Sequence, residues 1–323
     1  MKAVVCDRYG PPEVLHVEDV PRPAPAADEV LIRVRATTVT RTDDGMRKPY
    51  PWFGRLLGYG LRRPRRRIFG VEVAGVVEEV GGAVKEFKAG DRVFGHNSWR
   101  FGAHAEFVCM QESAALVQMP VSAKFEEVAP LCDGPMIALK YLKAANVGMG
   151  QRIAVYGASG SFGTACVQLA RYFGAHVTAV CNTRNVDVVR SLGADEVIDY
   201  TKQDFTKTGE RYDVIIDAVG KLPFSRCSSA MTHRGVYLPS DHLRNLALVA
   251  WTSRRPGKRV VFPIPPQYAK KDAEFIRGLS EAGKYRAVID RCYTLDQVVE
   301  ATRYVASAQK TGNVVLMVGG EAQ

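Results

Sequence analysis

The stretch Arg152-Ile153-Ala154-Val155-Tyr156-Gly157-Ala158-Ser159-Gly160-Ser161-Phe162-Gly163 joins a compact apolar run to a glycine-rich turn. Apolar residues then recur at helical spacing from Thr164 to Phe173 and stop at Gly174, so the pattern predicts a strand, a tight turn and a helix. In such a turn the backbone can approach a phosphate closely, and the first N–H groups of the helix are free to bind an anion. The G-x-x-G-x-x-G spacing in this context is typical of dinucleotide binding. The candidate cofactor-binding residues are Gly157, Ala158, Ser159, Gly160, Ser161, Phe162 and Gly163.

The residues after this turn continue as alternating strands and helices. Further strands are expected at His176 to Cys181, Glu196 to Ile198, Asp213 to Ala218 and Gly235 to Leu238. Alternation of this kind predicts a parallel sheet covered by helices on both faces, a doubly wound Rossmann fold. Ligands of such sheets bind at the carboxyl ends of the strands. The residues that follow one of these strand ends are therefore further cofactor candidates: Asp217, Ala218, Val219 and Gly220.

The first third of the chain has a different pattern, with short strands separated by turns up to about Met119. From Val30 to Val39, for example, charged and apolar residues alternate with the period of a half-buried strand. The chain ends on another apolar strand, Asn313 to Val318, which could rejoin this first part. The fold class predicted is α/β, with a β-rich domain at 1–122 and 266–323 and a nucleotide-binding Rossmann domain at 123–265.

The choice of cofactor rests on the end of the second strand. An enzyme that binds NAD usually carries Asp or Glu roughly 20 residues after the glycine turn, where it accepts hydrogen bonds from the ribose. Here the strand ends at Cys181-Asn182-Thr183-Arg184, with a hydroxyl and a cation and no acid. Thr183 and Arg184 therefore favour NADPH, and Tyr200 could contact the adenosine. The alternative is that Arg184 is a solvated residue at the start of a helix.

Several motifs together resemble the medium-chain dehydrogenase/reductase superfamily, and the resemblance covers nearly the whole chain. The segments that carry it are Gly10-Pro11-Pro12-Glu13-Val14-Leu15, Gly70-Val71-Glu72-Val73-Ala74-Gly75-Val76-Val77, Gly90-Asp91-Arg92-Val93-Phe94, the Gly157 to Gly163 loop, Ser191-Leu192-Gly193-Ala194-Asp195 and Gly312-Asn313-Val314-Val315-Leu316. The resemblance implies that the N-terminal part and the C-terminal tail form a GroES-like catalytic domain. The nucleotide-binding domain is then inserted between them.

The zinc ligands of the related alcohol dehydrogenases are missing. Thr40 and Val71 stand where those enzymes carry a cysteine and a histidine, and Cys132 alone falls near the third ligand position. One thiol does not hold a catalytic zinc ion, so no metal is expected. Without a Lewis acid, the acceptor must already tolerate negative charge. The resemblance therefore implies a zinc-free quinone oxidoreductase that reduces a quinone or an α,β-unsaturated carbonyl, with an alcohol dehydrogenase or aldehyde reductase of the same superfamily as the alternative.

By the same resemblance, Thr40, Thr42 and Asp43 are expected as polar groups on the acceptor side, and Arg41 as a pyrophosphate contact. The alternative for these residues is simple hydrogen bonding at a strand end. The Asp217 to Gly220 segment is expected to meet the nicotinamide ribose. His96 and His104 are expected to be structural, since no Ser/His/Asp arrangement is evident from the sequence.

Charge suggests further partners. The net charge is +10, and Arg62, Arg63, Arg65, Arg66 and Arg67 supply half of it. This cluster could contact nucleic acid, as in a crystallin-like member of the family, or an anionic membrane surface, but a solvated loop is the expectation. We see no signal peptide, no membrane span and no paired cysteine motif among the seven cysteines, which predicts a cytoplasmic protein with free thiols. A homodimer through a strand at Lys258 to Ile264 is expected by analogy only.

Overall fold

The computed structural model describes residues 1–48, 60–98, 100–263 and 268–319. The chain divides into two compact units. Unit 1 comprises Met1–Asp133, Tyr268–Glu281 and Ile289–Gln323, and unit 2 comprises Gly134–Gln267 and Ala282–Val288. The first boundary lies at residue 133, later in the chain than the predicted residue 122. The second predicted boundary, between residues 265 and 266, lies outside the described residues.

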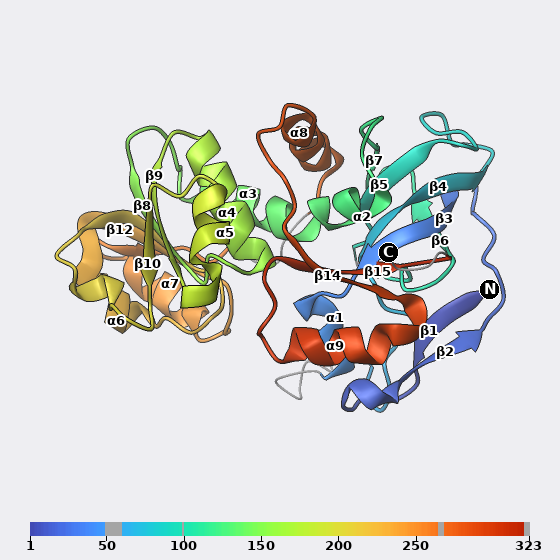
Figure 1. The fold of residues 1–323 in the computed structure, drawn as a ribbon, viewed down its shortest axis with the longest axis horizontal. Coiled ribbons are helices and arrows are strands. Elements are labelled where there is room, and N and C mark those ends of the chain that lie inside the picture. The colour runs from blue at the N-terminus through green and yellow to red at the C-terminus, as the bar shows by residue number, and fades with distance from the viewer. Residues whose placement is uncertain (49–59, 99, 264–267, 320–323) are drawn as a thin grey trace. The chain divides into compact units, whose positions relative to one another are not determined.

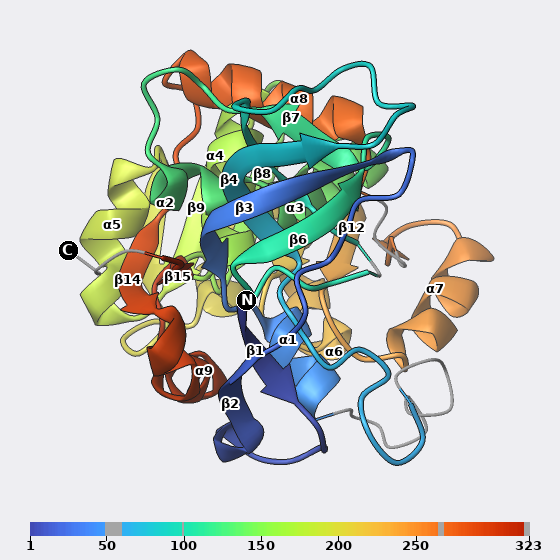
Figure 2. The ribbon, with the colours of Figure 1, turned by 90° about the vertical axis from the view of Figure 1, so that its right-hand side faces the viewer.

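Unit 1 is built on a seven-stranded sheet with the order β14-β15-β3-β4-β5-β7, to which β6 adds by pairing with β3. Figure 2 shows β3, β4 and β6 running side by side. The C-terminal strand β15 pairs with β3 antiparallel, so the end of the chain does rejoin its first part. The strands of this unit are β1 (Lys2–Cys6), β2 (Leu15–Asp19), β3 (Glu29–Thr38), β4 (Glu72–Val80), β5 (Arg92–His96), β6 (Phe107–Gln111), β7 (Ala115–Gln118), β14 (Ile289–Thr294) and β15 (Asn313–Met317).

The core of unit 1 explains why these strands form. Valines and isoleucines alternate along β3 and β4, and their inward side chains are fully buried with Leu316 of β15 and Val298 of the last helix. Branched side chains favour strands because they pack well on a pleated surface. The helices of this unit are α1 (Arg41–Arg47), α2 (Phe125–Val128), α8 (Lys270–Glu281) and α9 (Val298–Ala306).

Unit 2 contains a parallel six-stranded sheet with the order β10-β9-β8-β11-β12-β13. Its strands are β8 (Arg152–Tyr156), β9 (His176–Cys181), β10 (Glu196–Asp199), β11 (Tyr212–Asp217), β12 (Met231–Pro239) and β13 (Arg259–Val260). The chain order reverses between β8 and β11, which is the switch point where such sheets bind ligands. The edge strand β13 is shorter than the predicted 258–264 strand, whose last residue lies outside the described residues.

Helices flank this sheet, with α4 and α5 close to β8, β9 and β10 and α7 close to β13 (Figure 1). The helices are α3 (Asp133–Ala144), α4 (Ser161–Tyr172), α5 (Val186–Ser191), α6 (Phe224–Cys227) and α7 (Asn245–Ser253). The predicted fold class, a GroES-like β-rich domain with a Rossmann parallel-sheet domain, is therefore confirmed. Among the described residues, no helix combines the length and the apolar composition needed to cross a membrane.

Candidate functional site: a nucleotide loop and a buried acid cluster

The glycine turn of unit 2 lies between β8 and α4, as the sequence predicts. Gly157 has a φ of +81°, which a residue with a side chain rarely adopts. A Cβ atom on Gly163 would lie 2.2 Å from the carbonyl oxygen of Gly157, so the turn and the helix can approach only because both residues are glycine. Gly160 is the N-cap of α4 and offers no side chain to the first N–H groups of this twelve-residue helix. These groups are therefore available to an anion such as a pyrophosphate.

The end of β9 combines a cation with a hydroxyl network. Thr183 donates a hydrogen bond to Asp199 at 2.6 Å, and Thr201 donates to the other oxygen of the same carboxylate at 2.7 Å. These two hydroxyls lower the pKa of Asp199 below its usual value, so this acid at the end of β10 is ionised and already bound. Arg184, the residue after Thr183, is exposed, and Tyr200 is half exposed with its ring 6.3 Å from that of Tyr156. Asp199 and Thr201 are the residues of this network that the sequence reasoning did not single out.

Asp217 shapes the loop after β11. Its buried carboxylate accepts hydrogen bonds from the backbone N–H groups of Val219, Lys221 and Leu222 at 2.9–3.3 Å. Burial raises the pKa of Asp217, although these N–H groups act in the opposite direction. The side chain therefore fixes the loop that includes Ala218 and Gly220. A cavity of about 380 Å³ opens beside this loop, with Asp217, Gly220, Leu222, Tyr237, Leu248 and Trp251 in its lining.

In unit 1, the four predicted residues at the start of α1 have two kinds of environment. Thr40 and Asp43 form a capping box, in which the Thr40 N–H and hydroxyl both donate to Asp43 at 2.8 Å. The second oxygen of Asp43 accepts the N–H of Gly70 at 2.9 Å. Asp43 is 4% exposed, so its carboxylate is occupied in holding the helix start against the Gly70 segment. Arg41 and Thr42, by contrast, are exposed.

The three positions that correspond to zinc ligands in the related enzymes do not form a metal site here. The Thr40 hydroxyl is bound to Asp43, and Val71 is an apolar residue in the core. Of the three side chains, only that of Cys132 has an atom that ligates zinc, and its thiol is buried. This donor set does not fit the tetrahedral N/S coordination of a catalytic zinc ion.

A buried acid lies beside these positions. Glu72, the first residue of β4, is 1% exposed and accepts hydrogen bonds from the N–H groups of Cys132 and Asp133 at 3.1 and 2.6 Å. Its other oxygen accepts the hydroxyl of Thr38 at 2.5 Å. Burial and the nearby charge of Asp133 raise the pKa of Glu72 to about 8, so the group is mostly protonated at neutral pH. Lys310 is also buried, which lowers the pKa of its amine to about 8.

Asp133 is the centre of a second group of polar side chains. The Tyr268 hydroxyl donates to Asp133 Oδ1 at 2.6 Å, and His96 Nε2 lies 3.4 Å from the same oxygen. The His96 and Tyr268 rings are stacked, with centroids 3.6 Å apart. On its other side, His96 Nδ1 is 2.7 Å from the Ser98 hydroxyl. Burial raises the pKa of Asp133, but His96 and Tyr268 outweigh that effect and lower it below its usual value, so the carboxylate is ionised.

The two histidines of this unit, both expected to be structural, have different surroundings. His104 Nε2 is 2.8 Å from the carbonyl oxygen of Thr38, a structural contact inside the sheet. His96 instead belongs to the Ser98, His96 and Asp133 arrangement that the sequence did not reveal. The three residues come from a strand end, its turn and a distant helix start. The signal available was weak, since it consisted of a serine two residues after a histidine and an acid next to Cys132.

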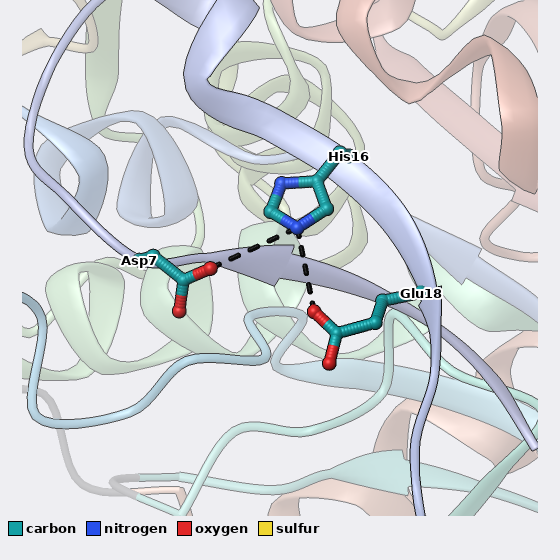
Figure 3. Close-up of side chains that lie close together, drawn as sticks. All are labelled: Asp7, His16 and Glu18. Carbon is teal, nitrogen blue, oxygen red and sulfur yellow. Dashed lines mark ion pairs between the residues drawn. The ribbon is translucent and has the colours of Figure 1, made fainter.

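One residue of the arginine cluster, Arg67, forms ion pairs at the surface. Arg67 donates to Asp7 at 2.6 Å and to Glu18 at 3.3 Å. His16 Nε2 lies 3.7 Å from Asp7 and 3.4 Å from Glu18 (Figure 3). Among the described residues, Asp7, His16 and Glu18 are the one group of three whose atoms are close enough to hold a metal ion. The Arg67 guanidinium already bridges both carboxylates and balances one of their two negative charges.

Comparison with known proteins agrees with this geometry. Residues 26–121 match the alcohol dehydrogenase GroES-like domain, and residues 192–316 match a zinc-binding dehydrogenase domain. The chain is 31% identical to an Arabidopsis thaliana chloroplast envelope quinone oxidoreductase homolog over 93% of each protein. It is also 31% identical to an Arabidopsis thaliana NADPH-dependent alkenal/one oxidoreductase, over 98% of this chain and 79% of the relative.

A solved structure agrees as well. The quinone oxidoreductase from Coxiella burnetii superposes with a TM-score of 0.87 at 26% identity, over 98% of this chain and 99% of that one. The sequence relatives and the solved structure thus match almost the entire length, and both domain matches lie within it. This chain is an oxidoreductase of the medium-chain dehydrogenase/reductase superfamily, and within it belongs with the quinone oxidoreductase-like proteins.

Proposed function

We propose that the protein uses NADPH to reduce a quinone or an α,β-unsaturated carbonyl compound, without a metal ion. The observation that carries this proposal is the set of side chains at the three ligand positions, where Thr40 is hydrogen-bonded to Asp43, Val71 is apolar and Cys132 alone carries a thiol. Without a Lewis acid, an alcohol would keep a pKa too high for ready oxidation, and a simple carbonyl would remain unpolarised. Quinones and enones accept a hydride because their own conjugation takes up the charge. The related quinone and alkenal/one oxidoreductases support this choice.

The cofactor part of the proposal assigns roles to the residues of unit 2. The N–H groups from Ser161 to Gly163 would bind the pyrophosphate, and the loop from Asp217 to Gly220 would border the nicotinamide ribose. When bound, the reduced nicotinamide supplies a hydride. Arg184 is exposed at the end of β9, where a 2′-phosphate would need a cation, while Asp199 is occupied by Thr183 and Thr201. This favours NADPH over NADH.

On the acceptor side, we assign Thr40 and Asp43 to holding the start of α1 and leave Thr42 as the exposed hydroxyl that can meet the acceptor. Arg41, at the first position of the same helix, stays a proposed pyrophosphate contact. An alcohol dehydrogenase or aldehyde reductase remains the second candidate, supported by the alcohol dehydrogenase GroES-like and zinc-binding dehydrogenase domain matches.

The test is oxidation of NADPH and NADH followed against quinones, enones, aldehydes and alcohols, with and without a chelator. We expect turnover with quinones or enones, no effect of the chelator, and tighter binding of NADPH. Replacement of Arg184 by Ala should weaken NADPH by roughly 10- to 150-fold, because a charge-assisted hydrogen bond contributes about 1.5–3 kcal/mol. NADH should be nearly unaffected. Arg190→Ala is the matched control, since Arg190 is exposed nearby on α5 and paired with Asp187.

Three results would contradict the proposal. Stoichiometric zinc whose removal abolishes the rate would restore a metal mechanism. If the parent protein bound NADPH and NADH with equal affinity, the NADPH preference would be refuted. If Arg184→Ala lost affinity for both cofactors by the same factor, Arg184 would have a structural role. Turnover confined to alcohols and aldehydes would favour the alcohol dehydrogenase or aldehyde reductase function instead.

A further inference from the structure

We propose that Ser98, His96 and Asp133 form a proton relay that completes the reduction of enone acceptors, with Tyr268 as the positioning residue of the relay. This inference rests on the proposed function, because it assigns the source of the proton in that reaction. All four residues belong to unit 1. They come from the end of β5, the turn after it, the start of α3 and the segment before α8.

The contacts give the relay a direction. Asp133 is the ionised end, since the Tyr268 hydroxyl at 2.6 Å and His96 at 3.4 Å both face its Oδ1. His96 is 3% exposed, and its Nε2 has no other polar partner in the described part of the chain. Stacking on Tyr268 at 3.6 Å fixes the plane of the imidazole. Ser98 is half-buried, and its hydroxyl lies 2.7 Å from Nδ1, so it can pass a proton between this buried group and the outside.

Other charges around the relay favour the same direction. Glu72 is the pairing partner of His96 on the neighbouring strand β4. It is mostly neutral at pH 7, so it does not compete with Asp133 as a counter-ion. Lys310 places a buried amine near Asp133 and Glu72. The carboxylate of Asp133 therefore faces the Nε2 edge of the His96 ring, and the Ser98 hydroxyl lies at the Nδ1 edge. When Nδ1 carries its proton, it donates to Ser98, and the serine hydroxyl hydrogen is free to point at an acceptor.

The relay also lies beside the acceptor-side residues. The N–H of Asn97, between His96 and Ser98, donates to the carbonyl oxygen of Val71 at 2.6 Å. Asp133 directly follows Cys132, and Glu72 binds Thr38, two residues before Thr40. The hydroxyl of Ser98 is thus close in the sheet to the segments assigned to the acceptor. A proton donor here would stabilise the acceptor oxygen in place of a metal ion.

The chemistry balances as follows. Bound NADPH would supply a hydride to the β-carbon of the enone, and the C=C electron pair would move to the oxygen to give an enolate. Ser98 would then donate its hydroxyl proton to the enolate oxygen while His96 Nδ1–H reprotonates Ser98, and the resulting enol would tautomerise to the saturated ketone. Solvent would return one proton to His96 through Ser98. Donation by a positioned group of this kind contributes roughly 10²- to 10⁴-fold to a rate.

Two acceptors of different basicity separate this relay from a structural role. Hydride transfer to a quinone gives a phenolate-type anion, whose conjugate acid has a pKa near 10, so this product needs little help from a proton donor. An enolate is much more basic. We expect Ser98→Ala and Asp133→Asn to lower kcat for an enone by about 100-fold or more and to change kcat for a quinone by only a few-fold. Ser98→Thr should restore the enone rate because it keeps the hydroxyl. His233→Gln, an exposed histidine of unit 2, is the control.

A second readout needs no turnover. In protein labelled with ¹⁵N-histidine, Ser98→Ala should shift the Nδ1 resonance of His96, and Asp133→Asn or Tyr268→Phe should shift Nε2. Equal losses with both acceptors, or unchanged His96 resonances in the folded variants, would overturn the relay. Such a result would leave the proposed function intact as long as the parent reduces quinones or enones with NADPH. A parent that reduces neither would refute the proposed function itself.

Discussion

The two candidate sites of this protein are built from different parts of the polypeptide. The Gly157 to Gly163 loop offers backbone N–H groups, and its shape depends on the absence of side chains. The cluster around Glu72 and Asp133 is instead made of side-chain oxygens and nitrogens that burial has removed from water. A backbone site should thus be damaged by added atoms, and a side-chain site by removed functional groups.

The largest expected effect tests the first half of this comparison. In Gly163→Val, the new Cβ would lie 2.2 Å from the Gly157 carbonyl oxygen and 2.8 Å from the Ala158 Cα, both of which are backbone atoms that cannot rotate away. We expect the free energy of NADPH binding to become less favourable by at least about 3 kcal/mol, which corresponds to a loss of affinity of roughly 100-fold or more. Binding can be measured by quenching or enhancement of NADPH fluorescence.

The matched control is in the same loop. A Cβ on Gly160 would have the Gly157 oxygen at 3.9 Å as its nearest neighbour, and the φ of Gly160 is −78°, which any residue adopts. Gly160→Ala should therefore fold normally and keep its NADPH affinity within a few-fold. If both variants lost the cofactor equally, the loop would depend on more than backbone geometry.

This contrast also explains how far the sequence could be read. The glycine loop was predictable because a tight turn imposes glycine at fixed spacing, and the alternation of strands and helices around it predicted the sheet. The start of α1 was predicted as a polar segment, but its capping box was not. Whether Thr40 meets another residue or a ligand depends on its rotamer and on Gly70, which lies far along the chain.

The relay was not predictable for a related reason. Each of its residues is common at a strand end or helix start, and nothing in the spacing of 96, 98, 133 and 268 indicates contact. The sheet register sets Glu72 opposite His96, and the chain returns Tyr268 to Asp133 only after the first segment of unit 2, residues 134–267. Side-chain sites assembled from distant segments therefore need the fold before they can be recognised.

The second prediction concerns pH and the buried acid of unit 1. Because the pKa of Glu72 is about 8 in the folded protein and 4.5 as a free side chain, the folded state binds more protons than the unfolded state between these values. The free energy of unfolding should therefore fall as the pH rises from about 5 to 8, by an amount on the order of a few kcal/mol. Chemical denaturation at a series of pH values measures this slope.

Glu72→Gln tests the assignment because the amide oxygen can still accept the two N–H bonds and the amide N–H₂ can donate to Thr38. This variant should be folded and should show a flatter slope over the same range. Measurements should stop near pH 8, since the lowered pKa of Lys310 makes stability rise again above that value. An unchanged slope in Glu72→Gln would show that another group titrates.

The smallest effect is expected at the surface, where neither kind of site is present. Arg65 and Arg66 are exposed beside a cleft of about 670 Å³ that also includes Phe107 and Pro21, while Arg67 is held by Asp7 and Glu18. Changing Arg65 and Arg66 to Ser should leave turnover and thermal stability unchanged. Any binding to duplex DNA at low salt should weaken, with the slope of log affinity against log salt reduced by about two, since each phosphate contact contributes nearly one.

Arg67→Ser should instead cause a small loss of stability, because surface ion pairs contribute little. Tight, sequence-selective binding to RNA at physiological salt that disappears in the double variant would assign this surface a function of its own.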